Sequence, residues 1–308
     1  MSRTENTAIG ECTPHLATSE ILLQKILVAI DFSEQSSRAL KEAIAIALCF
    51  DSEILLVHAA SPAVYGTGME SIPIVTFEME LEVAKARMAD LLLGEPALKE
   101  IHHREFVAYA GAVDLVRQVA EENGVDLVVA GSRGASGLDL LVLGSVAESI
   151  LGTVPCPVLI VGPHCHREPH PFRSILFATD LDTTGLRSAQ FASSFAERFH
   201  ARLTLLHVIE KNSGSFGVQP ELAEETIRQE LARLLPPDLS TYTSAAIQVE
   251  QGKASDIIPQ TARALGTSLI VMGFGGHTSF GDHSPWSTLS QVVREAPCPV
   301  LNVRCHFV

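Results

Sequence analysis

The segment KILVAID at residues 25–31 returns as SILFATD at residues 174–180, so a short apolar strand ending in aspartate occurs twice in this chain. Further matching segments follow in the same order in both halves. They are EILLVH (53–58) with RLTLLH (202–207), VDLVVAGSRG (125–134) with TSLIVMGFGG (267–276), and VPCPVLIV (154–161) with APCPVLNV (296–303). A repeat of this kind indicates one structural unit that is present twice. The continuous Val- and Ile-rich runs are typical of strands covered on both faces.

Helical patterns lie between these strands. In 81–93 the residues Leu81, Ala84, Met88 and Leu91 fall on one face of a 3.6-residue period. The other helical segments are 33–50, 112–123 and 145–153 in the first half, and 183–200, 254–265 and 287–295 in the second. Each half therefore alternates β and α, which predicts an α/β fold with two tandem, doubly wound parallel sheets of five strands each.

The length of 308 residues suits two domains of common size. We expect an N-terminal tail at 1–23, a first domain at 24–162, a linker at 163–172 and a second domain at 173–308. The linker region, GPHCHREPHPFR (162–173), contains prolines and has no periodicity.

The composition excludes several classes of partner. A net charge of −14 without a Lys/Arg cluster argues against nucleic acid, although backbone N–H groups at a helix start could still bind a small anion. Residues 1–21 do not have the pattern of a signal peptide, and no apolar run is long enough for a membrane span. The six cysteines contain no C-x-x-C pair, as expected of thiols in a reducing cytoplasm. We therefore expect a cytoplasmic protein with no membrane or nucleic-acid partner.

One loop of the first half has the residues needed to bind phosphate. Gly131-Ser132-Arg133-Gly134 ends a strand, and Gly144-Ser145 begins a helix nine residues later. The glycines permit close backbone approach, and we expect Gly144 and Ser145 to present free N–H groups where the helix dipole favours an anion. The alternative is purely structural: Ser145-x-x-Glu148 could form a capping box, and any single glycine could serve a turn.

These residues resemble the universal stress protein family, whose nucleotide-binding members carry Gly-x2-Gly-x9-Gly-Ser/Thr after the fourth strand. Gly131, Gly134, Gly144 and Ser145 match that pattern without a gap, and KILVAID, ILLVHA and CPVLIV also match. The resemblance covers about 24–162 and 173–305. It implies strand order 3-2-1-4-5 in each sheet and ATP, with or without Mg²⁺, as the ligand of the first domain.

The resemblance also implies further contacts with the nucleotide. Asp31 matches an acidic residue near adenine and ribose, Ala29 a small residue on the first strand, and Ala59 a backbone contact for adenine. Val146 follows Ser145 at the phosphate end, and Ser132 and Arg133 lie within the loop. Asp31 has a structural alternative, as a turn residue before the helix that begins at Ser33.

The second copy departs from this pattern. Gly273 and Gly276 are retained, but Trp286 stands where the first half has Gly144, and Pro285 precedes it. An indole at this position would obstruct a phosphate, so we interpret the second domain as a degenerate or non-binding copy. The alternative is a repurposed pocket in which Trp286 stacks on a ligand.

Two groups of histidines are assigned no chemistry. His164, Cys165, His166 and His170 lack the second cysteine pair of a zinc site and are expected to be a solvated linker. His58 and its counterpart His207 recur in both copies, which favours a role in packing or at the strand end.

The leading hypothesis is a stress-response protein that binds ATP as a signal, with no catalytic residues. Phosphoryl transfer needs charge stabilisation at the γ-phosphate, and the loop offers only Arg133. One alternative is a slow ATPase with Asp31 holding Mg²⁺ and Arg133 or Ser145 near the phosphates. The other is a nucleotide-independent interaction scaffold.

Both copies end in an apolar strand that should lie at a sheet edge, where an uncovered strand is a liability. The resemblance implies that single-domain relatives dimerise through this strand. We therefore predict that 157–161 pairs antiparallel with 299–303 about a pseudo-twofold axis, which makes one chain an intramolecular pseudo-dimer. The sequence leaves open whether two such chains form a homodimer.

Overall fold

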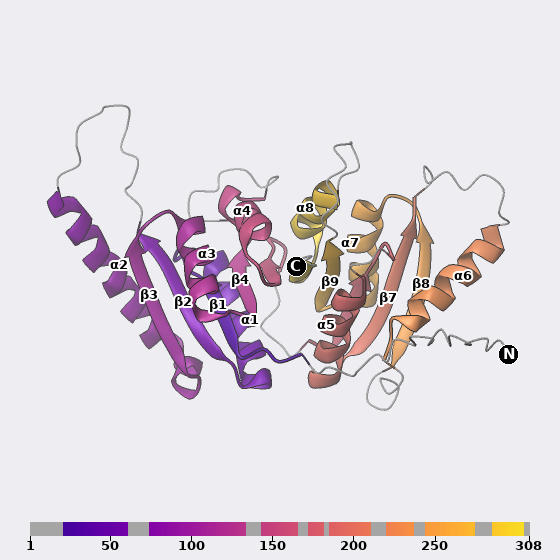
Figure 1. The fold of residues 1–308 in the computed structure, drawn as a ribbon, viewed down its shortest axis with the longest axis horizontal. Helices are drawn as coiled ribbons and strands as arrows, with labels where there is room; N and C mark the ends of the chain where they lie inside the picture. Colours follow the sequence, from indigo (N-terminus) through magenta and orange to yellow (C-terminus); the bar gives the residue numbers. More distant parts are fainter. Residues whose placement is uncertain are drawn as a thin grey trace, which may run out of the picture.

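The structure is a computed structural model, and it describes residues 21–60, 74–133, 143–165, 172–181, 185–210, 220–236, 244–274 and 285–304. Ten strands form one continuous sheet in the order β3-β2-β1-β4-β5-β10-β9-β6-β7-β8 (Figure 1). Each half has the predicted order 3-2-1-4-5, and the halves meet through their fifth strands. The predicted fold class is therefore confirmed.

The first half consists of β1 (Lys25–Ala29), α1 (Glu34–Phe50), β2 (Glu53–Ala60), α2 (Ile74–Gly94), the short 3₁₀ helix η1 (Pro96–Glu100), β3 (His103–Tyr109), α3 (Ala112–Asn123), β4 (Leu127–Gly131), α4 (Ser145–Thr153) and β5 (Val158–Val161). The second half consists of β6 (Ser174–Ala178), α5 (Gly185–Arg198), β7 (Arg202–Ile209), α6 (Pro220–Arg233), β8 (Ala245–Gln251), α7 (Ala254–Leu265), β9 (Leu269–Phe274), α8 (Pro285–Glu295) and β10 (Val300–Arg304). The bounds expected for α3, α4 and α7 are those observed, whereas α2 begins seven residues before the predicted 81, at Ile74.

The two halves are joined by antiparallel pairing of β5 with β10. Leu159 pairs with Leu301, while Ile160 pairs with Val300 and Val158 pairs with Asn302. Because Leu159 and Leu301 are equivalent in the repeat, the pseudo-twofold axis passes through this pair. The predicted intramolecular pseudo-dimer is confirmed.

Both faces of the sheet are covered, as the apolar strand runs require. One buried cluster lies beneath α1, α2, α5 and α6, and a second lies beneath α3, α4, α7 and α8. Each cluster contains residues from both halves, so the two domains share their core. Met88 of the predicted stripe is fully buried in the first cluster.

Aromatic contacts reinforce the junction between the halves. Phe50 of α1 lies 5.3 Å from Phe195 of α5 between ring centroids, and Phe172 lies 5.0 Å from Phe199. The Cys49 thiol donates a hydrogen bond to the carbonyl of Arg198 at 3.4 Å. The first and fifth helices therefore contact each other directly across the domain boundary.

Within the described part of the chain, we find no helix with the length and apolar character needed to cross a membrane.

Candidate functional site

The two glycine blocks of the first half lie against each other at the carboxyl end of β4. The N–H of Gly144 donates to the carbonyl of Ser132 at 2.8 Å, which fixes the start of α4 beside the residues that follow β4. This edge of a parallel sheet is where open α/β folds bind ligands. Gly134, the remaining glycine of the motif, lies outside the described residues.

The space around the backbone favours glycine at these two positions. A Cβ added to Gly131 would lie 3.1 Å from the backbone carbon of Gln35, and one added to Gly144 would lie 3.1 Å from the Ser132 carbonyl oxygen. Contacts this short force a neighbour to shift. The backbone is therefore tightly packed here, and the structural role proposed for single glycines has direct support.

The start of α4 differs from the sequence-based expectation in two respects. The N-cap is Gly144, and Ser145 is the first helical residue, so the alternative in which Ser145 caps the helix through a capping box is wrong. The expectation of a free N–H on Gly144 is also wrong, because this group bonds to Ser132. The first N–H to bond back into the helix is that of Glu148, which donates to the Gly144 carbonyl at 2.9 Å. The first-turn N–H groups of Ser145, Val146 and Ala147 are those that an α-helix leaves without intrahelical partners.

Ser132 and Arg133 are more deeply buried than loop residues usually are. Their exposed fractions are 2% and 8%. The Ser132 N–H extends the sheet by donating to Val161 at 2.9 Å, while its hydroxyl is buried without a hydrogen-bond partner. Ser145 is exposed, and so is Val146. The hydroxyls of Ser132 and Ser145 thus flank the junction, one buried and one accessible.

Asp31 stabilises a turn at the end of β1. Its Oδ1 accepts a hydrogen bond from the Ser33 N–H at 3.0 Å, and Phe32 between them adopts a left-handed φ of 61°. Ser33 in turn caps α1 by accepting from the Ser36 N–H. The turn role considered for Asp31 is therefore confirmed.

The two equivalent histidines play the strand-end role that their recurrence favoured. His58 Nδ1 lies 2.7 Å from the Ile30 carbonyl oxygen, and His207 Nδ1 lies 2.9 Å from the Thr179 carbonyl oxygen. Burial lowers the pKa of His58; the nearby guanidinium of Arg87 adds to this effect, while the Ile30 carbonyl and the Asp31 carboxylate oppose it.

Ala29 and Ala59 lie on the neighbouring strands β1 and β2, and both pack against the buried cluster beneath α3 and α4. Ala147 of α4 belongs to the same cluster. The structure therefore places both alanines on the face of the sheet that α4 covers. Both side chains are small and lie partly buried against this cluster.

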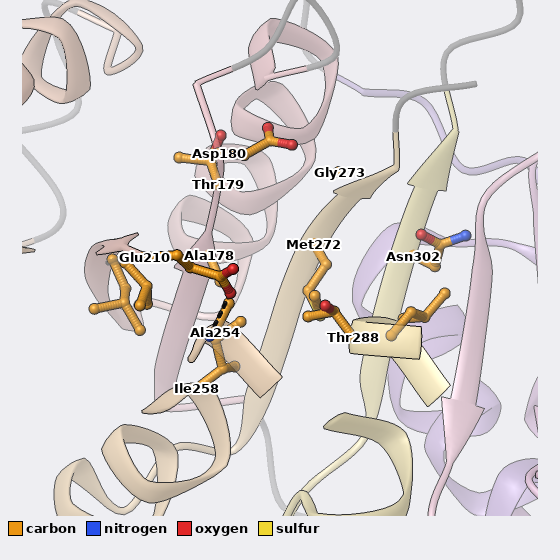
Figure 2. Close-up of a pocket in the computed structure, with 13 residues that line it drawn as sticks. Ala178, Thr179, Asp180, Glu210, Ala254, Ile258, Met272, Gly273, Thr288 and Asn302 are labelled. Atoms are coloured by element: carbon orange, nitrogen blue, oxygen red, sulfur yellow. Dashed lines mark hydrogen bonds between the residues drawn. The ribbon is translucent and has the colours of Figure 1, made fainter. Parts of the chain in front are cut away.

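The second domain contains a cavity of about 220 Å³ (Figure 2). It lies at the position that corresponds to the predicted nucleotide site of the first domain. The repeat offset is 149 for the first two strands and 142 from β8 onward, as the matched segments define it. By these offsets, five lining residues correspond to predicted site residues of the first domain. Ala178, Asp180, Val208, Gly273 and Thr288 are the counterparts of Ala29, Asp31, Ala59, Gly131 and Val146.

One lining residue, Asn302 of β10, was not identified as a site residue from the sequence. It is 1% exposed, and its counterpart in the first domain is Ile160. The signal was present, because Asn302 interrupts the otherwise apolar CPVLNV strand. A polar residue in the middle of a strand buried on both faces needs a physical reason.

The histidine- and cysteine-containing linker is only partly described. His166 and His170 lie outside the described residues, while Cys165 is buried and burial raises its pKa to about 12. Among the described residues, no three His, Cys, Asp or Glu side chains are grouped so as to hold a metal ion.

The geometry defines a class of protein: a tandem, doubly wound α/β protein with a cavity at the carboxyl ends of the strands of its second domain. The model of the universal stress protein family matches residues 23–162 and again residues 171–304. The chain belongs to the universal stress protein family and contains two of its domains.

Individual relatives agree with this assignment. Universal stress protein YxiE of Bacillus subtilis is 32% identical over 147 residues, which are 46% of this chain and 99% of that protein. A universal stress protein of Mycolicibacterium smegmatis is 26% identical over 291 residues, which cover 91% of this chain and 96% of that one. The crystal structure of a universal stress protein from Archaeoglobus fulgidus has a TM-score of 0.66 at 18% identity, covering 92% of this chain and 99% of the other. The last comparison concerns the fold alone.

Proposed function

We propose that the first domain binds one ATP and that the protein acts as a nucleotide-responsive stress regulator. The observation that carries this proposal is the junction at the end of β4, where Gly144 bonds to Ser132 and the first turn of α4 begins beside the strand end. A phosphate group would accept hydrogen bonds from the first-turn N–H groups and from the exposed Ser145 hydroxyl. The positive end of the helix dipole would add to this attraction.

The site suits an anion although the chain as a whole is acidic. Formal charge is −14, so long-range attraction does not bring ATP to the protein. Binding must come from short-range backbone groups, which act within the first helical turn. Ala29 and Ala59 have small side chains at the neighbouring strand ends, where the base and ribose would lie. Asp31 would reach the ribose through its carboxylate while it also stabilises the turn.

The burial of Arg133 favours ATP binding without rapid hydrolysis. Phosphoryl transfer needs a cation aimed at the γ-phosphate, and Arg133 is only 8% exposed. We therefore favour a sensing role over a slow ATPase. Steady-state phosphate release with Mg²⁺ present distinguishes the two.

Calorimetric titration of the full chain with ATP tests the proposal, and the expected stoichiometry is one ATP per chain. Ser145→Pro is the sharpest variant, because proline is favoured at the first helical position and Gly144 already has the extended ψ of 142° that a following proline requires. This change removes one N–H and one hydroxyl without breaking α4. We expect it to weaken ATP binding about 100-fold, since each hydrogen bond to a charged group contributes about 1.5–3 kcal/mol.

Ser145→Ala is the matched control, because it removes the hydroxyl and keeps the N–H. It should weaken binding by only about tenfold. Gly144→Trp, which copies the residue of the second domain, should abolish binding. Unchanged affinity in Ser145→Pro, or two ATP molecules of similar affinity per chain, would contradict the proposal.

A further inference from the structure

The C-terminal end of α4 in the first domain is bonded to a residue of the second domain. Arg304, the last residue of β10, donates a hydrogen bond from Nη1 to the carbonyl oxygen of Gly152 at 2.7 Å. Gly152 lies in the last turn of α4, where carbonyl groups have no partners within the helix and the helix dipole favours a cation. An arginine of the second domain therefore caps the helix whose first turn forms the proposed phosphate site.

The strand end that carries this guanidinium is fixed within the second domain. Arg304 pairs with Phe274 of β9 in the parallel register of β10 and β9. Arg187 of α5 donates from Nη1 to the Arg304 carbonyl oxygen at 3.3 Å. The bond to Gly152 thus connects α4 to an element that the second domain holds in place.

The second domain caps its own fourth helix in a different way. Arg263 of α7 donates from Nη2 to the carbonyl oxygen of Glu295, the last residue of α8, at 2.5 Å. By the offset of 142, the counterpart of Arg263 in the first domain is Glu121 of α3. An ionised carboxylate only accepts hydrogen bonds, and Glu121 accepts one from Arg117 at 3.2 Å. Glu121 therefore cannot do for α4 what Arg263 does for α8.

The seam between the domains is asymmetric at the same place. The counterpart of Arg304 is Gly162, which directly follows β5. A Cβ added to Gly162 would lie 2.5 Å from the carbonyl oxygen of Val293 in α8, so no side chain fits there. The end of β5 thus meets the backbone of α8 directly, whereas the end of β10 reaches α4 through a cationic side chain.

The position of α4 depends on its end contacts because the helix is short. It has nine residues, and three of its side chains are buried. Helices of this length are marginal in water without tertiary contacts. At the start of the helix the Gly144 N–H bonds to the Ser132 carbonyl at 2.8 Å, and in the last turn the Gly152 carbonyl bonds to Arg304. The orientation of the first-turn N–H groups therefore depends on both bonds.

We infer that Arg304 is a positioning residue for the ATP site of the first domain, through which the second domain holds α4 in its binding orientation. This inference rests on the proposed function, because it concerns the affinity of that site for ATP. The dependence runs in one direction, since α8 is capped by Arg263 of its own domain while α4 is capped across the boundary. A change at the end of β10 should therefore alter ATP affinity in the first domain.

Calorimetric titration of full-length variants with ATP is the first test. Arg304→Ala should weaken ATP binding about two- to fivefold, which is the range expected for a charge at a helix terminus. Arg304→Lys should restore most of the affinity, because an ammonium group can also donate to carbonyls of the last turn. Arg263→Ala is the matched control: it removes the same side chain from the end of α8 and should leave ATP affinity unchanged.

Hydrogen exchange of the ATP-free protein, measured separately for α4 and α8, is the second test. Arg304→Ala should speed exchange in α4 and leave α8 unchanged, and Arg263→Ala should do the reverse. A wild-type chain that does not bind ATP would contradict the proposed function and with it the positioning role, while exchange would still decide whether Arg304 holds α4. Unchanged α4 exchange in Arg304→Ala overturns the inference, and so does faster exchange with wild-type ATP affinity.

Discussion

The two domains have the same strand order and corresponding strand pairings, yet they differ near the carboxyl ends of their fourth and fifth strands. Gly144 caps α4 in the first domain, whereas α8 in the second begins at Pro285 and has Trp286 at the equivalent position. Ile160 is buried in the first domain, whereas its counterpart Asn302 is a buried, unpartnered amide. The differences change polar groups at the site and leave the sheet intact. The scaffold depends on apolar burial spread over many residues, while the proposed ligand binding would depend on a few.

A third difference lies in the core. Glu42 of α1 is 9% exposed, and the offset of 149 makes its counterpart Phe191 of α5. The same helical position thus holds a carboxyl in one domain and an aromatic ring in the other. Burial raises the pKa of Glu42 to about 7.

The largest expected effect comes from breaking the strand pair that relates the two domains. Ile160 and Val161 are at most 1% exposed, so Ile160→Lys with Val161→Lys would bury two unpaired charges at the junction. We expect a loss of more than about 5 kcal/mol, comparable to the whole stability of a domain. Size-exclusion chromatography and thermal denaturation should reveal aggregation or separate melting of the halves.

Val83→Lys is the matched control for this change, because Val83 on α2 is 54% exposed. It should alter the free energy of unfolding by less than about 0.5 kcal/mol. A folded, cooperatively melting Ile160→Lys/Val161→Lys variant would show that the two domains do not need each other's edge strand.

An effect of intermediate size on the free energy of unfolding should come from Glu42, which stands where the second domain has Phe191. Folded Glu42 has a pKa of about 7 against an ordinary 4.5, so the folded state binds more protons than the unfolded state between these values. The contribution of the Glu42 carboxyl to the free energy of unfolding is fully present below about pH 4.5 and is lost as the pH rises through 7. The loss amounts to about 3 kcal/mol at 1.36 kcal/mol per pKa unit. Glu42→Gln should remove this decline, measured by urea unfolding at pH 5 to 8.

Glu34→Gln provides the control on the same helix, because the Glu34 side chain is 80% exposed. Its stability should follow the wild-type pH profile. A Glu42→Gln profile that parallels the wild type would mean that Glu42 is ionised in the folded protein throughout this range.

The smallest expected effect is at a position where the two domains should respond equally to substitution. Gly124 ends α3 and Gly266 ends α7, both with a left-handed φ, 61° and 59°, and an added Cβ would meet nothing within 4 Å at either position. The cost of Gly124→Ala and of Gly266→Ala is therefore conformational, about 1 kcal/mol each, and equal in the two domains. Chemical denaturation of the two single variants measures it. Costs that differ by more than about 1 kcal/mol would show that the helix ends are not equivalent.

The fold could be predicted from the sequence because the same pattern of strands and helices occurs twice and has a direct physical cause. Apolar strand runs alternating with helical periods fix a doubly wound sheet, and an apolar edge strand in each copy requires a partner, which β5 and β10 provide for each other. Helix α2 was predicted too short, although Ile74 and Phe77 continue the apolar stripe of Leu81 toward the N-terminus at helical spacing. Phe77 packs against Tyr109 of β3, with 4.4 Å between the ring centroids.

The site was less predictable because hydrogen-bond partners depend on distances that spacing does not encode. Gly144 and Ser132 are twelve positions apart, and the bond between them removes the N–H that the motif suggested would be free. The helix start moved Ser145 from capping residue to first helical residue. Asn302 could have been noticed as a polar interruption of a strand, but its cavity depends on side chains from β6, β7, β9, α7 and α8.

Pairing β5 with β10 inside one polypeptide removes a constraint that symmetry imposes on paired copies of a single gene product. In a homodimer with this register, every substitution appears on both sides of the axis, so an asparagine at this position would bury two amides near the junction. Here Asn302 faces Val158 while its counterpart Ile160 faces Val300. The covalent connection lets one copy accept a costly polar residue while the other keeps the apolar residue that stabilises the seam. Duplication within a chain thus allows the two halves to diverge in chemistry without either giving up its partner.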